Sequence, residues 1–378
     1  MKKTEWIELF NKIKHTFISF LAILLFIACA TALFVGIHWT IGSLSLSLEK
    51  EYTDGNMYNF KVQSELGFTD EIIEDLKKSD YIDDIETFNE TYRFFTFNNE
   101  PCQAKIISLT EKMNNPLRIE GNLPTKLGEA AIDSHFAKQK GVKVGDKFTF
   151  TTNQFLSPVG LLEDEFTITA IIDTAEYMGK YEDTNGFSFA SYANINTIIY
   201  LTEESFNKEV FNKYYGFYIK SNELNTLETL SEEYSNKSAE LKTKIEDLLN
   251  TSASKHLHLK KEDVAKTYNI TERNHNASLF GLKCVRDTFD KMQYSLVTLF
   301  IIIALLVCYS TLSRLIHDES VLIGMKKAQG FSTRKILLPF VIYSELAAII
   351  GMVIGVLIRI FWNRTNYSKF HKTNFFIW

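Results

Sequence analysis

Three histidines in the middle of this 378-residue chain are the first candidates for chemistry. His256, His258 and His275 offer imidazole groups, which are common zinc ligands. Carboxylates or cysteines at ligand spacing do not accompany them, and several lysines surround them. We therefore prefer a solvated basic loop to a metal site, and expect no metal in this chain.

Motifs for catalysis and nucleotide binding are missing from the sequence. It has no G-x-x-x-x-G-K phosphate loop, no G-x-S-x-G nucleophile elbow and no H-E-x-x-H zinc motif. The acidic pairs Asp83-Asp84 and Glu203-Glu204 are typical of surface residues or first helical turns. We expect no enzyme activity and no bound cofactor, so any ATP and Mg²⁺ must be held by another chain.

The composition narrows the class of protein further. A formal net charge of −5 gives no reason to expect nucleic-acid binding, and 46% hydrophobic residues suffice for a sizeable core. Cys29 and Cys308 lie in apolar runs, which leaves Cys102 and Cys284 far apart in sequence. One disulfide between these two is the alternative, but two thiols fit the spacing better.

Three apolar runs are long enough to cross a membrane: residues 17–41, 292–312 and 336–358. A cleavable signal peptide is the alternative for the first run, although no small-residue cleavage site follows it. In the third run, Glu345 is costly in lipid and is expected near the inner interface or against another helix. Gly351 and Gly355 form a small-xxx-small pattern that allows close helix approach.

Charges beside these runs predict their orientation. Lys2, Lys3, Lys12 and Lys14 precede the first run, whereas three acidic residues follow it, so the N-terminus is predicted to be cytoplasmic. The basic connection 313–335 is placed on the same side. The basic, aromatic tail 359–378 fits this rule less well, because a third span would deliver it outside; a re-entrant third segment is an alternative.

Residues 1–16 carry apolar side chains at helical spacing with lysines between them. We interpret this segment as an amphipathic helix lying on the cytoplasmic surface of the membrane. A simple extension of the first span is the alternative.

Residues 49–291 are predicted to form a large extracytoplasmic α+β domain between the first and second spans. Alternation predicts strands at 59–64, 91–97, 104–109, 147–151, 166–172 and 197–201, and end signals predict helices at 69–78 and 134–140. Residues 222–250 predict a long helix or helical hairpin. It could be a stalk or a surface helix of the domain.

The connection 313–335 looks like a docking segment. Leu315, Leu322 and Met325 are predicted to share a helical face, Gly330 to end the helix, and Ser332 to cap the third span. A short amphipathic helix of this kind can enter a groove on a partner. The alternative is that its basic residues only orient the membrane spans.

Two stretches resemble one known family. The stretch from Asp318 to Ile336 reads DESVLIGMKKAQGFSTRKI. It contains an acidic residue, an Ile-Gly step, a Lys-Ala pair and a glycine before a basic span entry. This order resembles the cytoplasmic segment of FtsX/MacB-type ABC transporter permeases. The stretches 120–124, 128–130 and 141–146 look like the same family's extracytoplasmic domain. The order of spans and domain also matches, and the resemblance covers the chain to about Gly355.

The resemblance implies a permease subunit in the bacterial cytoplasmic membrane that is multi-pass and works with a cytoplasmic ABC ATPase, a second permease chain and membrane lipid. ATP and Mg²⁺ would enter through the ATPase. The work would be export or extraction of peptide, lipid or lipoprotein, or mechanotransmission. The implied ATPase-coupling residues are Glu319, Leu322, Gly324, Met325, Lys326, Lys327, Ala328, Gly330, Ser332 and Lys335.

One departure from the family leaves a second function open. Such permeases are expected to have four spans, whereas three are found here, so a truncated chain or one half of a pair is expected. The alternative is a membrane-anchored receptor or assembly factor whose outside domain binds a partner without ATP-driven transport.

Overall fold

The computed structural model describes residues 3–97, 100–151, 160–177, 195–207 and 213–370. The chain divides into two compact units. One contains residues 1–44 and 285–377, and the other is built mainly from residues 45–284. Each is described by itself below.

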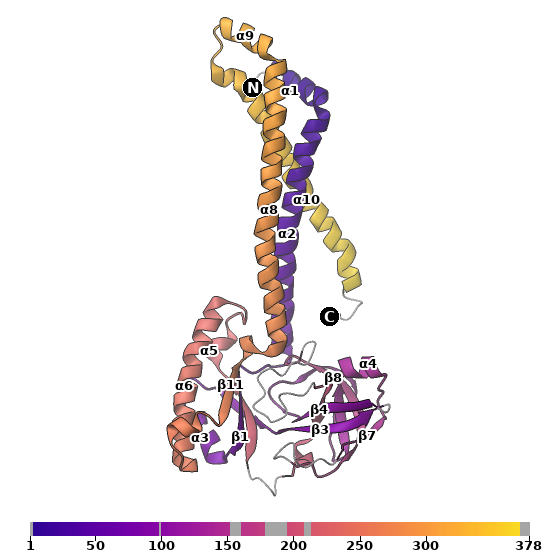
Figure 1. Ribbon diagram of the computed structural model, residues 1–378, viewed down its shortest axis with the longest axis vertical. Coiled ribbons are helices and arrows are strands. Elements are labelled where there is room, and N and C mark those ends of the chain that lie inside the picture. Colours follow the sequence, from indigo (N-terminus) through magenta and orange to yellow (C-terminus); the bar gives the residue numbers. More distant parts are fainter. Residues whose placement is uncertain (1–2, 98–99, 152–159, 178–194, 208–212, 371–378) are drawn as a thin grey trace. The chain divides into compact units, whose positions relative to one another are not determined.

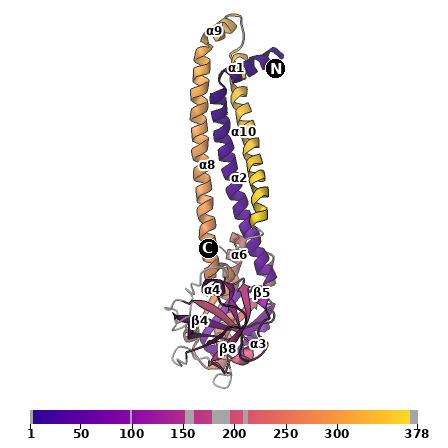
Figure 2. The same cartoon turned by 90° about the vertical axis from the view of Figure 1, so that its right-hand side faces the viewer.

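Three long helices dominate the first unit, and each is long and apolar enough to cross a membrane. Figure 2 shows them side by side. They extend well beyond the apolar runs that predict them, and the last contains part of the tail that we treated separately. Their bounds are α2 (Phe17–Asp54), α8 (Ala277–Asp318) and α10 (Thr333–Phe370), where α2 and α8 continue into the second unit.

Two shorter helices complete this unit. The helix α1 (Lys3–His15) is followed by a turn residue, Thr16, and α2 begins at the next residue. The helix α9 (Ser320–Ala328) lies between α8 and α10. The predicted connection 313–335 is therefore helical over most of its length.

The second unit contains a four-stranded antiparallel sheet in the order β11-β1-β10-β2 (Figure 1). The strands are β1 (Phe60–Phe68), β2 (Asp84–Phe88), β10 (Tyr214–Lys220) and β11 (Tyr268–Glu272). Buried residues of α3 (Asp70–Lys77) and α6 (Glu232–Leu257) pack with this sheet in one apolar core. Short helices α5 (Asn222–Asn225) and α7 (Lys261–Val264) accompany them.

A mixed seven-stranded sheet forms the other half of this unit, along the path β3-β4-β9-β6-β8-β5 with β7 beside β8. Its β4–β9 and β6–β8 pairs are parallel and its other pairs antiparallel. Its elements are β3 (Glu90–Phe97), β4 (Glu100–Ser108), β5 (Pro116–Gly121), β6 (Glu129–Asp133), α4 (Ser134–Lys140), β7 (Lys147–Thr149), β8 (Glu165–Thr174), β9 (Thr197–Leu201) and the 3₁₀ turn η1 (Glu203–Ser205).

Residues 222–250, predicted as a long helix or a helical hairpin, contain the short helix α5 and most of the long helix α6. Helix α5 ends at Asn225 and α6 begins only at Glu232, because Ser231 caps it by accepting a hydrogen bond from the Tyr234 amide. Leu241 and Ile245 of α6 are buried in the core of the four-stranded sheet. This helix is part of the domain body and not a stalk.

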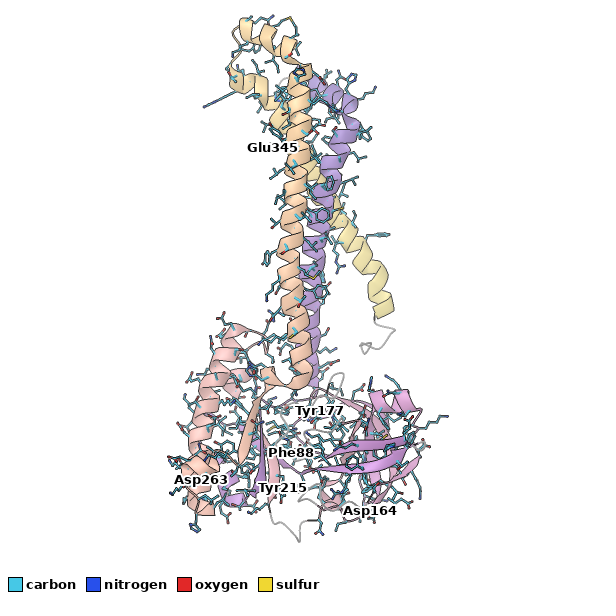
Figure 3. The ribbon with its side chains drawn as sticks, viewed as in Figure 1. Phe88, Asp164, Tyr177, Tyr215, Asp263 and Glu345 are labelled. Carbon is cyan, nitrogen blue, oxygen red and sulfur yellow. The ribbon has the colours of Figure 1, made fainter. Side chains whose placement is uncertain are left out.

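A buried ionic network joins the two sheets. The Lys61 ammonium on β1 lies 2.7 Å from a Glu176 carboxylate oxygen, which follows β8. Lys105 on β4 lies 3.3 Å from Glu90 on β3, and Glu90 also faces Lys61 at 3.7 Å. Lys61 lies over the Phe88 ring, a residue marked in Figure 3. These charged side chains are removed from water and compensate one another. The network therefore holds the two sheets in one position relative to each other.

Lys220, at the end of β10, gives a pH-dependent prediction. Burial, and next the nearby positive charge of Arg273, lower the pKa of Lys220 to about 8 from 10.5. The unfolded chain therefore keeps this proton to higher pH than the folded chain does. Stability should rise between about pH 8 and 10.5 on this account. We expect Lys220→Met to remove that rise when unfolding of the full-length protein is followed by pulse proteolysis; identical pH slopes would contradict the assignment.

Candidate functional site

The predicted coupling residues lie on one helix–turn–helix segment. Glu319 stands at the junction of α8 and α9. Gly330 follows α9, Ser332 precedes α10 and Lys335 lies in the first turn of α10. Between these, α9 carries Leu322, Gly324, Met325, Lys326, Lys327 and Ala328.

Helix α9 exposes most of its surface, and Ile323 is the α9 residue that packs against the apolar core of this unit. None of its nine residues is buried, and Val321 is 74% and Met325 52% exposed. Leu315 was predicted to share a face with Leu322 and Met325, and Leu315 and Leu322 do line one cavity, although they lie on different helices. Glu319 interrupts the helix, so Leu315 stays on α8, where it is 5% exposed and packs with the apolar core of this unit.

Gly324 and Gly330 differ in what their surroundings require of them. Gly330 has φ +85, a left-handed conformation that ends α9, as the sequence predicts. Gly324 lies inside α9, where glycine costs roughly 0.5–1 kcal/mol relative to alanine. A Cβ added there would meet no atom within 4 Å in this chain. Its own chain therefore gives Gly324 no reason to lack a side chain.

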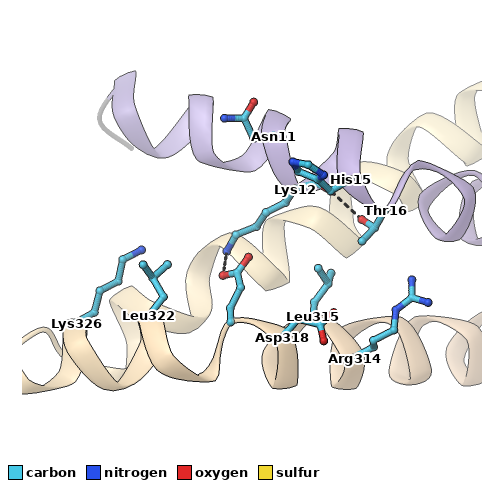
Figure 4. Close-up of a pocket in the computed structure, with 10 residues that line it drawn as sticks. Asn11, Lys12, His15, Thr16, Arg314, Leu315, Asp318, Leu322 and Lys326 are labelled. Atoms are coloured by element: carbon cyan, nitrogen blue, oxygen red, sulfur yellow. Dashed lines mark hydrogen bonds and ion pairs between the residues drawn. The ribbon is translucent and has the colours of Figure 1, made fainter.

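A buried ion pair ties α1 to the start of α9 (Figure 4). The Lys12 ammonium lies 2.8 Å from a Glu319 carboxylate oxygen and 4.0 Å from the centre of the Phe340 ring on α10. One turn on, the hydroxyls of Thr16 and Tyr343 are 3.0 Å apart. We call these five residues the α1 clasp. Sequence reasoning missed Lys12 as a site residue, since its partners are distant in sequence and give no local signal.

A cavity of about 850 Å³ lies beside the clasp. Figure 4 shows that α1 and the end of α8 both supply its lining. The lining combines cationic, acidic and apolar side chains. Its residues are Asn11, Lys12, His15, Thr16, Arg314, Leu315, Asp318, Glu319, Leu322 and Lys326.

Charge reversal tests the clasp. Lys12→Glu or Glu319→Lys leaves two like charges facing each other at a partly buried site, at a cost of roughly 1–3 kcal/mol. We expect hydrogen exchange of α1 amides in the full-length protein to accelerate about tenfold or more in either variant. The double variant should recover part of this loss, since the ion pair is restored.

Lys14→Glu is the matched control for this experiment, because Lys14 lies on α1 but is exposed. Single reversals that exchange like the control would show that the ion pair does not hold α1.

Helix α10 packs closely on α2 through the predicted small-xxx-small pattern. A Cβ on Gly351 would lie 2.7 Å from the Leu24 carbonyl oxygen, and one on Gly355 would lie 2.6 Å from that of Ala28. Real Cβ atoms do not approach so closely, so both glycines are required for this contact. Glu345, labelled in Figure 3, is exposed on α10, whereas Tyr343 and Ala347 are buried.

Two of the histidines lie beside carboxylates. His256 lies 3.0 Å from Asp75, and His275 lies 3.5 Å from Glu272. Within the described residues, no group of three or more His, Cys, Asp or Glu could hold a metal. Cys102 is buried and Cys284 is exposed, and no disulfide joins them in the structure.

Comparison with known proteins identifies the C-terminal part of the chain. Residues 294–376 match the family described as FtsX-like permease C-terminal. No curated protein matches the chain.

Two solved structures are similar at low scores. The extracellular domain of the noncanonic ABC-type transporter YknZ from Gram-positive bacteria has 9% identity and a TM-score of 0.33, covering 57% of this chain and 100% of its own. The periplasmic region of MacB from Actinobacillus actinomycetemcomitans has 12% identity and a TM-score of 0.28, covering 65% and 97%.

The family match falls on the segment where the sequence shows its resemblance. It includes most of α8, all of α9 and α10 to Phe370, which together carry every predicted coupling residue. Three apolar helices and this match make the chain a membrane protein. Residues 294–376 are therefore similar to the C-terminal region of FtsX-like permeases.

Proposed function

We propose that this chain is the permease subunit of an ABC transporter that couples ATP hydrolysis by a separate ATPase to movement of its α+β domain. The observation that carries the proposal is the FtsX-like match over 294–376, together with the largely exposed helix α9 within it. Its apolar residues Leu322 and Met325 are exposed, and a short amphipathic helix of this kind can pack on a partner.

The proposed orientation follows from the charges beside the apolar helices. Lysines precede α2, and five lysine and arginine residues lie in the connection 313–335. Under the positive-inside rule, α1 and α9 face the cytoplasm and the α+β domain lies outside. We place the protein in the bacterial cytoplasmic membrane as a multi-pass subunit with a cytoplasmic N-terminus.

The proposed ATPase contact is the exposed surface of α9. Leu322 and Met325 would enter an apolar groove, and the open space around Gly324 would admit the partner's backbone closely. Lys326 and Lys327 would add charge at its edge, Ala328, Gly330 and Ser332 would set the following turn, and Lys335 would begin α10. Glu319 would act differently, by positioning α1 through Lys12.

The proposed work is export or extraction of a peptide, lipid or lipoprotein, or mechanotransmission to an outside partner. A second permease chain is part of the proposal. The exposed carboxylate of Glu345 supports it, since a carboxylate facing lipid is costly and a neighbouring helix could shield it. Membrane lipid covers the remaining apolar surface, and ATP and Mg²⁺ belong to the ATPase.

Affinity purification of the full-length chain from native membranes tests this function. We expect it to recover a nucleotide-binding ATPase, and Gly324→Leu to reduce that recovery about tenfold or more, because a side chain would block close approach at a hot spot. Gly42→Leu is the matched control, because a Cβ at Gly42 also meets nothing within 4 Å. Recovery of outside partners alone would replace the proposal with a receptor or assembly factor.

A further inference from the structure

We propose that Arg273 joins the end of α2 to the beginning of α8 inside the α+β domain. We call these two helix ends the roots, and their connection, the joint, would make both helices move the domain together. This inference rests on the proposed function, since it concerns the route by which a helix movement reaches the domain. All the contacts that carry it lie within the unit 45–284.

Strand pairing brings the two roots together. Strands β1 and β11 are antiparallel neighbours, and the first residue of β1, Phe60, pairs with the last residue of β11, Glu272. The linker 55–59, which leaves α2, therefore lies beside the short turn η2 (Arg273–His275), which leads into α8. The backbone confirms this, because the Arg273 amide donates to the Asn59 carbonyl at 2.9 Å.

The Arg273 guanidinium spans this junction. Its Nε donates to the Tyr58 carbonyl at 2.6 Å, and its Nη2 donates to the Met57 carbonyl. Its central carbon lies 5.6 Å from the ring centre of Tyr52, in the last turns of α2. One side chain thus touches the end of α2, the linker after it and the entry to α8.

The burial of the Arg273 guanidinium costs free energy, because it removes a charged group from water. Arg273 is 5% exposed and Tyr52 is 2% exposed. Within the described part of the chain, the hydrogen bonds of Arg273 go to carbonyl oxygens and not to a carboxylate. Placing an arginine among carbonyl groups and aromatic rings gives up hydration without forming an ion pair. The planar guanidinium offers several hydrogen-bond donors in fixed directions, so it can bind neighbouring carbonyl groups at the same time.

Further contacts near Arg273 also connect the roots of α2 and α8 to the domain. The Asn276 side-chain amide donates to the Tyr58 hydroxyl at 3.3 Å, and Glu49 on α2 accepts from the Thr229 amide at 2.5 Å. Leu48 of α2 and Leu279 of α8 are buried in one apolar core. A displacement of either root must therefore strain the linker and the strand that follows it.

Lys220 also binds the linker 55–59. Its ammonium donates to the Met57 carbonyl and to the Asn56 side-chain oxygen, both at 2.8 Å. Two cations thus converge on one carbonyl group. Lysine cannot replace arginine here, because a single ammonium cannot span two successive carbonyls and a ring face.

The test uses the full-length chain bound to its ATPase and compares amide exchange of α3 and α6 with and without ATP and Mg²⁺. We expect Arg273→Met to reduce the nucleotide-dependent change in exchange rate about tenfold, the factor for losing hydrogen bonds to a charged group. Arg273→Lys should fall between this variant and the parent. ATPase recovery should be unchanged in both variants, since α9 is untouched.

Ile270→Val is the matched control, because Ile270 is buried on β11 but lies in the sheet core and not at the joint. It should weaken the domain and leave the nucleotide-dependent change intact. If Arg273→Met does not fold, Arg273→Lys decides the question. A full nucleotide response in the folded variants would overturn the joint, whereas a parent chain without ATPase or response would refute the proposed function instead.

Discussion

Gly355→Ala is expected to separate α10 from α2 and to lower the thermal stability of the full-length protein in detergent. The added Cβ would lie 2.6 Å from the Ala28 carbonyl oxygen and 2.9 Å from the Thr31 Cβ. Neither atom is the far end of a flexible side chain, so the helices must move apart. Overpacking of this kind costs roughly 1–3 kcal/mol.

The control for this variant adds the same methyl group in the same unit. Gly42 lies in α2, and a Cβ there meets no atom within 4 Å. Gly42→Ala should be neutral or slightly stabilising, since alanine is the better helix former. The measurement is the fraction of monodisperse protein that remains after heating. Equal midpoints for the two variants would contradict the close contact between α2 and α10.

Gly216→Ala is expected to disturb the core of the α+β domain by a similar amount. Gly216 on β10 pairs with Phe88 on β2, and an added Cβ would lie 2.3 Å from the Phe88 ring. Phe88 is 1% exposed and stacks on Tyr218 with ring centres 4.3 Å apart, so the ring cannot move freely. We expect a loss of roughly 1–3 kcal/mol in the free energy of unfolding, measured by pulse proteolysis.

A double variant separates this clash from a general effect of alanine in a strand. Phe88→Leu shortens the side chain, so Gly216→Ala should cost less in its presence than in the parent. Gly160→Ala serves as the control, because its Cβ would meet Asn207 at an ordinary 3.5 Å. Additive costs for Gly216→Ala and Phe88→Leu would show that the two positions do not interfere.

Elements with strong local signals could be predicted from the sequence. Strand β9 has the predicted bounds, and α4 runs from Ser134 to Lys140 before Gly141 in the left-handed conformation. The α+β class of the domain follows from such segments. Strands β2, β5, β6, β10 and β11 were not predicted. Strand β5 begins at a proline, and β6 contains two alanines, which are uncommon in strands. Strand β10 is rich in aromatic residues, but Gly216 interrupts them.

The candidate site divides in the same way. Gly330 was predictable, because a glycine after an amphipathic stretch is a local stop signal. The contact of Lys12 with Glu319 was not, since the two residues meet only after the chain has folded back. The same is true of Arg273, whose partners precede it by the length of the whole domain. Long-range polar contacts leave no periodic trace in the sequence.

The measurement that tests the central claim most directly is hydrogen exchange of the full-length chain in complex with its ATPase, with and without ATP and Mg²⁺. The account predicts a nucleotide-dependent change in the unit 45–284, which Gly324→Leu abolishes and Gly42→Leu preserves. A bound ATPase that hydrolyses ATP while exchange in that unit stays constant, or a response that survives Gly324→Leu, would contradict coupling through α9.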